Sequence, residues 1–333
     1  MDTKVILLKS RPQGKPTPDN FEFVTEEVPE LQDGQILLES LYVSVDPYLR
    51  GRMRDAKSYV EPFKLDEPLT SGTVARVKQS KHEDFAEGDH VSGMLPWKEL
   101  QVHDGKGLHK VSKDQAPLSA YLGVLGMTGL TAYFGLEEIG KLKEGETLVV
   151  SGAAGAVGSV VGQIGKLKGC RVVGIAGTDD KIELLKKDFG FDAGINYKTT
   201  EDMRKALKEH CPDGIDVYWD NVGGEIADAV YFLINRFARI VNCGAIAVYN
   251  DTDIPQGVAP QPFLIKNSAL MQGFIVSNYQ DRFQEGIQQL AQWYGQGKLK
   301  HEETLVEGFD QLPQAFISLF EGKNTGKMVV KTA

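Results

Sequence analysis

Ser151-Gly-Ala-Ala-Gly-Ala-Val-Gly158 is the stretch of this sequence that decides the fold. An apolar run precedes it, and a segment with apolar residues at helical spacing, 157–168, follows it. A glycine-rich turn between a strand and a helix is typical of a dinucleotide site, because the N–H groups and the dipole of a helix N-terminus attract phosphate. Gly155 would let the backbone approach the pyrophosphate, and Gly158 would let the helix pack closely on the sheet. Ala153 stands where the usual motif has its first glycine, and a small residue still permits the tight turn.

The chain on both sides of this stretch alternates strand-like and helix-like patterns. The sequence predicts strands at 148–151, 171–175, 193–196, 215–219, 239–242 and 270–275, and helices at 126–136, 157–168, 180–188, 200–210, 224–233 and 279–296. Apolar strands separated by helices of about 10–15 residues are typical of parallel βαβ units that are covered on both faces. We therefore expect an α/β domain built on a parallel sheet.

The first part of the chain, up to Leu122, has a different character. Short runs at 36–39, 73–77 and 90–93 alternate apolar and polar residues, as half-buried strands do, and turn residues separate them. This pattern predicts an irregular β-barrel or sandwich. The run at 328–331 predicts a last strand that rejoins this domain. We therefore expect a first domain made of 1–122 with 300–333, and a second domain of 123–299.

Composition sets limits on the class of protein. The chain has 333 residues, enough for two domains, and its 41% hydrophobic and 25% charged residues are typical of a globular protein. A net charge of −9 argues against nucleic acid or an anionic membrane as the main partner. No secretory signal and no apolar run long enough to span a bilayer occurs, so we expect a soluble, cytoplasmic protein. Cys170, Cys211 and Cys243 form no C-x-x-C pair, which indicates neither a disulfide framework nor a metal knuckle.

The end of the second predicted strand bears on the choice of dinucleotide. An NAD site has an acid there to hold the ribose 2′-hydroxyl, but this strand ends at Gly177-Thr178 with Lys181 one turn further on. An open corner with a lysine would receive a 2′-phosphate, so the sequence favours NADP. In the alternative, Lys181 is a solvated helix residue and Asp179 binds the ribose.

The sequence also lacks an obvious zinc site. No cysteine precedes Cys170, and the histidines of the first domain have no plausible set of partner ligands. Without a Lewis acid, the alkoxide left by hydride addition to a simple carbonyl is hard to stabilise. Hydride addition to an enone gives a delocalised enolate, which one hydrogen-bond donor stabilises by roughly 2.7–4 kcal/mol in comparable oxyanion sites. A metal-free site therefore favours reduction of a C=C bond over oxidation of an alcohol.

Several separated motifs carry a resemblance to one family. They are SerValAspProTyrLeuArg (44–50), ThrAlaTyrPheGlyLeu (131–136), AlaAlaGlyAlaValGly (153–158), AsnTyrLys (196–198), AspAsnValGlyGly (220–224), CysGlyAlaIle (243–246), GlyPheIleVal (273–276) and GlyLysAsnThrGlyLys (322–327). In these motifs the chain resembles the zinc-independent medium-chain dehydrogenase/reductases of the prostaglandin reductase, plant double-bond reductase and bacterial curcumin reductase group. The resemblance implies a GroES-like domain with a Rossmann domain, a homodimer, no metal, and an NADPH-dependent alkenal/one reductase.

The resemblance also implies particular site residues. Cofactor contacts are expected from Gly155, Ala156, Val157, Gly158, Lys181, Tyr197, Asn221, Cys243, Gly244, Ala245, Ile246, Tyr249, Phe274, Ile275, Val276 and Asn324. Tyr249 falls on the family's tyrosine after the fifth strand, and a phenol with a pKa near 10 suits proton donation to an enolate. In the alternative, Tyr249 only orders its loop. Tyr48 is a second catalytic candidate that would shape the substrate pocket, with Arg50 beside it as an ion-pair partner.

Three functions remain open from the sequence. The first is reduction of an unsaturated ketone or aldehyde, with hydride delivered to the β-carbon. The second is quinone reduction, and the third is an NADPH-binding protein with a structural or sensing role. Met127-Thr128-Gly129 departs from the Met-Pro-Gly of mammalian relatives, so substrate preference does not carry over from them.

Overall fold

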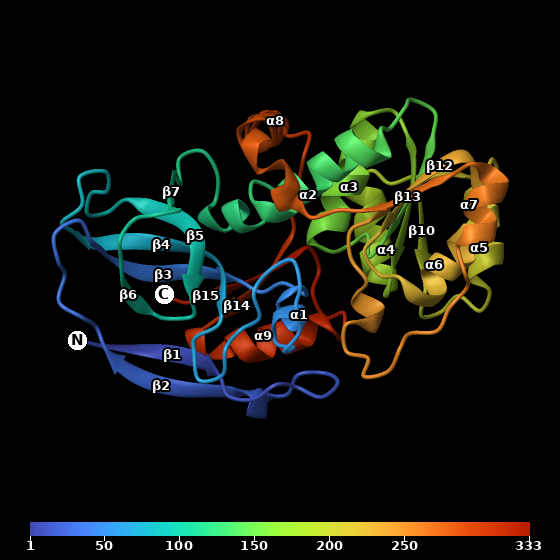
Figure 1. Cartoon of the computed structure of the whole chain (residues 1–333). Coiled ribbons are helices and arrows are strands. Elements are labelled where there is room, and N and C mark those ends of the chain that lie inside the picture. The colour runs from blue at the N-terminus through green and yellow to red at the C-terminus, as the bar shows by residue number, and fades with distance from the viewer. The chain divides into compact units, whose positions relative to one another are not determined.

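The computed structural model describes all residues from Met1 to Ala333, and the chain divides into two compact units (Figure 1). The first unit contains Met1–Leu122, Glu303–Asn324 and Met328–Ala333, and the second contains Gly123–Glu302 and Thr325–Lys327. The second unit therefore includes residues 300–302 and 325–327, which the sequence predicts in the first domain. Gly326 shows why, because its N–H donates to the Ala154 carbonyl at 2.7 Å.

A six-stranded parallel sheet forms the centre of the second unit, in the order β10-β9-β8-β11-β12-β13. The strands are β8 Thr147–Ser151, β9 Arg171–Ala176, β10 Ala193–Asn196, β11 Ile215–Asp220, β12 Ile234–Asn242 and β13 Leu270–Gly273. After β8, the chain adds β9 and β10 on one side of β8. It then crosses over and adds β11, β12 and β13 on the other side of β8. This is the strand order of a doubly wound, Rossmann-type sheet, and the reversal between β8 and β11 is the place where such sheets bind ligands.

Helices cover both faces of this sheet. They are α2 Met127–Gly135, α3 Ala156–Leu167, α4 Asp179–Lys187, α5 Met203–His210, α6 Gly224–Tyr231, α7 Gln261–Asn267 and α8 Phe283–Gly295. Side chains of α5, α6 and α7 join Val149 and Val173 in one apolar cluster. On the opposite face α3 packs so closely that a Cβ on Gly165 would lie 2.6 Å from Leu148 and 3.0 Å from Val172. Adjacent strand residues point to opposite faces, so the sheet is apolar on both sides, as its continuous apolar runs predict.

The first unit is built from β-sheets. Its strands are β1 Asp2–Leu8, β2 Phe21–Glu27, β3 Ile36–Ser44, β4 Thr70–Ser80, β5 His90–Pro96, β6 Leu100–His103, β7 His109–Val111, β14 Glu303–Glu307 and β15 Lys327–Lys331, and its helices are α1 Leu49–Arg52 and α9 Leu312–Leu319. β1 and β2 form an antiparallel pair, and the others form a sheet in the order β14-β15-β3-β4-β5-β7 with β6 against β3. β15 pairs antiparallel with β3, which returns the end of the chain to this unit as expected. The unit has the GroES-like β-rich architecture that the resemblance implies.

Arg50 differs from its expected role. Its side chain is 2% exposed, and it donates to the backbone carbonyls of Gly14, at 2.8 Å from Nη2, and of Pro12. No carboxylate pairs with it, so the expected ion pair is wrong. Burial, with Arg54 nearby, lowers the Arg50 pKa to about 10. Arg50 therefore fastens the loop at 12–14 to α1 through carbonyl groups.

Two elements of the second unit differ from the predicted ranges. β12 begins at Ile234, five residues before the expected start, but its pairing with β11 is interrupted between Ile234 and Arg239. Phe237 lies within this interruption with φ +64°, a left-handed conformation that breaks the apolar pattern of a strand. The expected helix at 279–296 is divided into a 3-10 segment, Val276–Arg282, and α8.

Candidate functional site

The predicted cofactor residues of the second unit gather at one edge of its sheet. Gly152 follows β8, Gly177 follows β9, Tyr197 follows β10, Asn221 follows β11, and Cys243 and Phe274 follow β12 and β13. Because all six strands are parallel, these positions lie along the carboxyl edge of the sheet. Ligands of open α/β sheets bind at this edge. The structure therefore brings together, at one edge, segments that are far apart in the sequence and contain the predicted cofactor residues of this unit.

The glycine-rich turn leaves backbone N–H groups open at the start of a helix. Gly152 has φ +59°, and the Gly155 N–H donates to the Gly152 carbonyl at 3.0 Å, which closes the turn. A Cβ on Gly158 would lie 2.4 Å from the Gly152 carbonyl oxygen, so only glycine allows this approach of helix and turn. The N–H groups of the first helical turn, at Ala156–Gly158, have no acceptor within the helix. These N–H groups fit the pyrophosphate of a dinucleotide.

The segment around Gly326 also contacts this turn. Gly326 pairs with Gly155 as an isolated bridge and has φ +64°. A Cβ there would lie 1.8 Å from the Glu302 carbonyl oxygen, so the position requires glycine. This close approach explains the second glycine of the GlyLysAsnThrGlyLys motif, Gly326. Asn324, two residues earlier, belongs to the first unit, and its cofactor contact stays a prediction.

The ends of β9 and β10 form the corner expected to receive the 2′-phosphate. The Tyr197 ring lies 3.0–3.2 Å from the point that a Cβ on Gly177 would occupy, so the glycine makes room for the ring. Thr178 is the N-cap of α4, and its hydroxyl accepts from the Lys181 N–H at 3.4 Å. Burial and the nearby Lys198 ammonium lower the pKa of Lys181. Two lysines therefore contribute positive charge here, and sequence reasoning singled out only Lys181.

Asp179 was the alternative ribose ligand, and the structure gives its carboxylate a partner. Asn196 Nδ2 donates to Asp179 Oδ1 at 2.7 Å. In the sequence, Asn196 is visible only as part of the AsnTyrLys motif, with no role of its own. A side-chain bond between the start of α4 and the end of β10 gives no local pattern, so periodicity could not have revealed it.

A buried hydrogen-bond network joins β8 to β11 below the site. Asp220 is 4% exposed, and its Oδ1 accepts from the Ser151 hydroxyl and the Tyr218 hydroxyl, both at 2.9 Å. The same oxygen accepts from the N–H groups of Val222 and Gly223. The Asn221 side chain donates to the Ser151 carbonyl at 2.7 Å and accepts from the Trp219 ring N–H at 3.0 Å. The network fixes the loop after β11, and Asn221 supports this loop whatever it contributes to the cofactor.

The loop from Cys243 to Tyr249 is anchored to the same network. The N–H groups of Cys243 and Gly244 donate to the Asp220 carbonyl at 2.9 and 3.1 Å. Burial and the Asp220 carboxylate raise the pKa of the Cys243 thiol to about 12, so it remains a thiol at neutral pH. The Tyr249 hydroxyl oxygen accepts from the Ala245 N–H at 3.2 Å. Burial raises the pKa of Tyr249, so the phenol keeps its proton at neutral pH.

The segment after β13 packs against the aromatic part of this edge. Phe274 makes an edge-to-face contact with Trp219 at a centroid distance of 5.9 Å. A Cβ on Gly135 would lie 2.3 Å from Trp219 and 2.6 Å from Phe274, so this glycine of α2 accommodates both rings. Phe274, Ile275 and Val276 are all half-buried. Their contact with a cofactor stays a prediction.

Tyr48, the second catalytic candidate, belongs to the first unit. Its ring packs against the apolar core that includes Leu49, Met53 and Phe63. Burial and the Asp46 carboxylate raise the pKa of Tyr48, which keeps this phenol protonated. Packing of the ring is its observed role, and its part in a substrate pocket stays a prediction.

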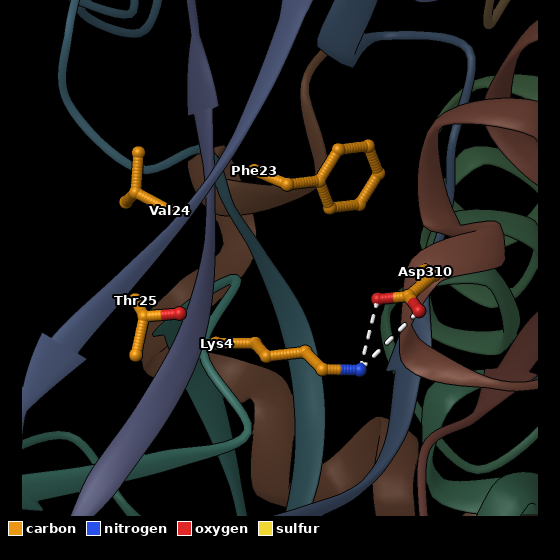
Figure 2. A pocket seen from close by; sticks show the side chains of 5 residues that line it. All are labelled: Lys4, Phe23, Val24, Thr25 and Asp310. Atoms are coloured by element: carbon orange, nitrogen blue, oxygen red, sulfur yellow. Dashed lines mark hydrogen bonds and ion pairs between the residues drawn. The ribbon is translucent and has the colours of Figure 1, made fainter.

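A shallow surface pocket of the first unit offers no alternative site. Figure 2 shows its lining, Lys4, Phe23, Val24, Thr25 and Asp310. Lys4 Nζ pairs with Asp310 Oδ2 at 3.3 Å, so the two charges neutralise each other (Figure 2). None of the predicted site residues lines this pocket. No group of three or more His, Cys, Asp and Glu side chains is placed to hold a metal ion, and no helix is both long and apolar enough to cross a membrane.

Comparisons with known proteins cover nearly the whole chain. A family model described as the N-terminal domain of oxidoreductase matches residues 4–111, and one described as zinc-binding dehydrogenase matches residues 156–292. The Bacillus subtilis (strain 168) protein YfmJ is 57% identical over 98% of this chain and 97% of its own. NADPH-dependent curcumin reductase of Escherichia coli (strain K12) is 43% identical over 98% of this chain and 96% of its own.

A solved structure agrees with these relatives. CurA from Vibrio vulnificus, in complex with NADPH, has a TM-score of 0.94 and 46% identity over 99% of each chain. The matches extend through both units. The chain therefore belongs to the zinc-independent medium-chain dehydrogenase/reductases, in the group of the prostaglandin reductases, plant 2-alkenal reductases and bacterial curcumin reductases.

Proposed function

We propose that this protein reduces the C=C bond of α,β-unsaturated ketones and aldehydes. It is an NADPH-dependent oxidoreductase of the curcumin, prostaglandin and alkenal reductase group. When bound, NADPH supplies the hydride, which goes to the β-carbon of the substrate. The observation that carries the proposal is Tyr249, a protonated phenol held on a loop at the carboxyl edge of the dinucleotide-binding sheet.

The cofactor would be held by groups from several strand ends. The first-turn N–H groups at Ala156–Gly158 suit its pyrophosphate, and Lys181 with Thr178 suits its 2′-phosphate. The loop from Cys243 to Tyr249 and the segment Phe274–Val276 follow strands on the other side of the β8–β11 reversal. A dinucleotide that crosses this reversal therefore has its 2′-phosphate near β9 and its nicotinamide toward β12 and β13.

Tyr249 gives the chain a means to stabilise the product of hydride addition. Addition at the β-carbon leaves an enolate, whose negative charge is shared between the oxygen and the α-carbon. A phenol with a raised pKa is un-ionised and can donate a hydrogen bond to that oxygen or a proton to the α-carbon. The Ala245 N–H on the phenol oxygen orients the ring and would stabilise the phenolate that proton transfer leaves.

The chemistry of the relatives supports the proposed substrate class. The Escherichia coli relative is a reductase of curcumin, a conjugated diketone whose C=C bonds are next to carbonyl groups. Its identity of 43% over the full length supports a related substrate here. An unsaturated carbonyl compound is the small-molecule partner that we propose.

A panel assay tests the proposal. NADPH oxidation is followed with enones, enals, quinones and the corresponding saturated ketones, and the products are identified by mass spectrometry. The proposal predicts that enones and enals give saturated carbonyl compounds, and that saturated ketones do not react. Turnover of quinones alone would establish a quinone reductase, and tight NADPH binding without any turnover would indicate a sensing or structural protein.

A further inference from the structure

Asn196 lies between Asp179, an acid at the phosphate corner, and the turn that carries Tyr197. It ends β10, beside Ala176 at the end of β9. Its Nδ2 donates to Asp179 Oδ1 at 2.7 Å, and its Oδ1 accepts from the Lys198 N–H at 3.1 Å. One amide therefore bridges the first residue of α4 and the turn after β10.

The Asp179 carboxylate creates an electrostatic problem for a 2′-phosphorylated cofactor. Asp179 directly follows Thr178, the cap residue of the helix that carries Lys181. A carboxylate at the end of the second strand is the group that NAD sites use to hold the 2′-hydroxyl, and it repels a 2′-phosphate. Asp179 is exposed, so its side chain could turn toward the cofactor unless another group held it.

The turn after β10 depends on the same residue. The Asn196 carbonyl accepts from the N–H groups of Thr199 and Thr200, and the Tyr197 N–H donates to the Ala176 carbonyl at 3.1 Å. These bonds place the Tyr197 ring against Gly177 and keep Lys198 near Lys181. Asn196 thus holds the acid on one side of the corner and the cationic turn on the other.

We infer that Asn196 is a positioning residue for cofactor discrimination, which holds the Asp179 carboxylate away from the 2′ position so that the corner accepts a phosphate. The inference rests on the use of NADPH stated above. Its test measures cofactor binding in the absence of any substrate. Failure of this inference is therefore distinguishable from failure of the proposed enone reduction.

The test is a double-mutant cycle on the full-length protein. The Kd values of NADPH and NADH are measured by calorimetry for the wild type, Asn196→Ala, Asp179→Asn and the double variant. Asn196→Ala should weaken NADPH about tenfold relative to NADH, the effect expected for losing a hydrogen bond to a charged group. In the Asp179→Asn background, the same substitution should change the NADPH/NADH ratio less than about twofold, because no carboxylate remains to be held.

A second variant separates this role from support of the turn. Asn196→Asp keeps an oxygen that can accept from the Lys198 N–H but loses the amide donor to Asp179. It should lose at least as much NADPH preference as Asn196→Ala, and Asp179→Asn should restore that preference to within about threefold. An unchanged NADPH/NADH ratio in Asn196→Ala, or an equal effect in both Asp179 backgrounds, would overturn the inference. Because the ratio compares two ligands on the same preparation, partial unfolding does not imitate the result.

Discussion

At the scale of single residues, the Tyr249 hydroxyl combines a hydrogen bond from the Ala245 N–H with a pKa raised by burial. If the phenol donates to the enolate, Tyr249→Phe should lower kcat by about 100-fold, within the range of general acid catalysis. The Kd of NADPH should change less than about threefold, because only the hydroxyl is removed. Stopped-flow kinetics and calorimetry check the two values. An unchanged kcat would leave Tyr249 with the role of ordering its loop.

The pH dependence gives the control for this prediction. A free phenol ionises near pH 10, and burial moves the pKa of Tyr249 above that value. The donor is present below the raised pKa and is lost as pH rises through it. We therefore expect kcat of the wild type to stay level up to about pH 9 and to fall above about pH 10. The Tyr249→Phe variant should lack this fall.

Lys181 is the residue that we expect to distinguish NADPH from NADH. Lys181 lies in the first turn of α4, next to the cap residue Thr178, and burial with the nearby Lys198 ammonium lowers its pKa. Lys181→Ala should weaken NADPH by about tenfold or more and NADH by less than about twofold, since only NADPH has a 2′-phosphate. Lys186→Ala, in the last turn of the same helix, is the matched control and should affect neither Kd. Equal losses of affinity for NADPH and NADH in Lys181→Ala would show that Lys181 does not contact the 2′-phosphate.

At the scale of elements, Asp220 joins the ends of β8 and β11. Asp220→Ala would leave the buried Tyr218 hydroxyl and the N–H groups of Val222 and Gly223 without their acceptor. The free energy of unfolding should fall by about 3 kcal/mol or more, because each stranded buried donor costs about 1–3 kcal/mol. Tyr218→Phe removes a single donor, and we expect a loss of about 1 kcal/mol. Urea titration measures both values, and similar losses would contradict the role of Asp220 as the shared acceptor.

The sequence predicted elements well where burial leaves a local pattern. β8, β9 and β11 are buried on both faces, so they appeared as continuous apolar runs, and the glycine turn marked the start of α3. The pattern failed at Phe237, whose left-handed backbone interrupts β12, and at the β1–β2 pair, which the sequence analysis did not recognise. Side-chain bonds between elements, such as Asn196 to Asp179 and Arg50 to Gly14, follow no sequence period. These bonds could be found only from the structure.

At the scale of the whole molecule, the homodimer implied by the family remains a prediction. β13 is the last strand of the six-stranded sheet, and Leu270 at its start is 46% exposed. An edge strand with an exposed apolar side chain is a template for pairing with a second chain. Sedimentation velocity should therefore give twice the monomer mass, and Leu270→Lys should shift the protein toward monomer. A wild type that is monomeric at all concentrations would refute the assignment.

The central claim is that hydride from NADPH reaches the β-carbon of an unsaturated carbonyl compound. Its most direct test uses NADPH that carries deuterium at the transferred position, together with 4-phenylbut-3-en-2-one. NMR spectroscopy then locates the deuterium in the product. We predict the saturated ketone with deuterium on the β-carbon, and the same result after treatment of the enzyme with a metal chelator. Deuterium on the hydroxyl-bearing carbon of an allylic alcohol would contradict this mechanism. Turnover that requires an added metal ion would also contradict it.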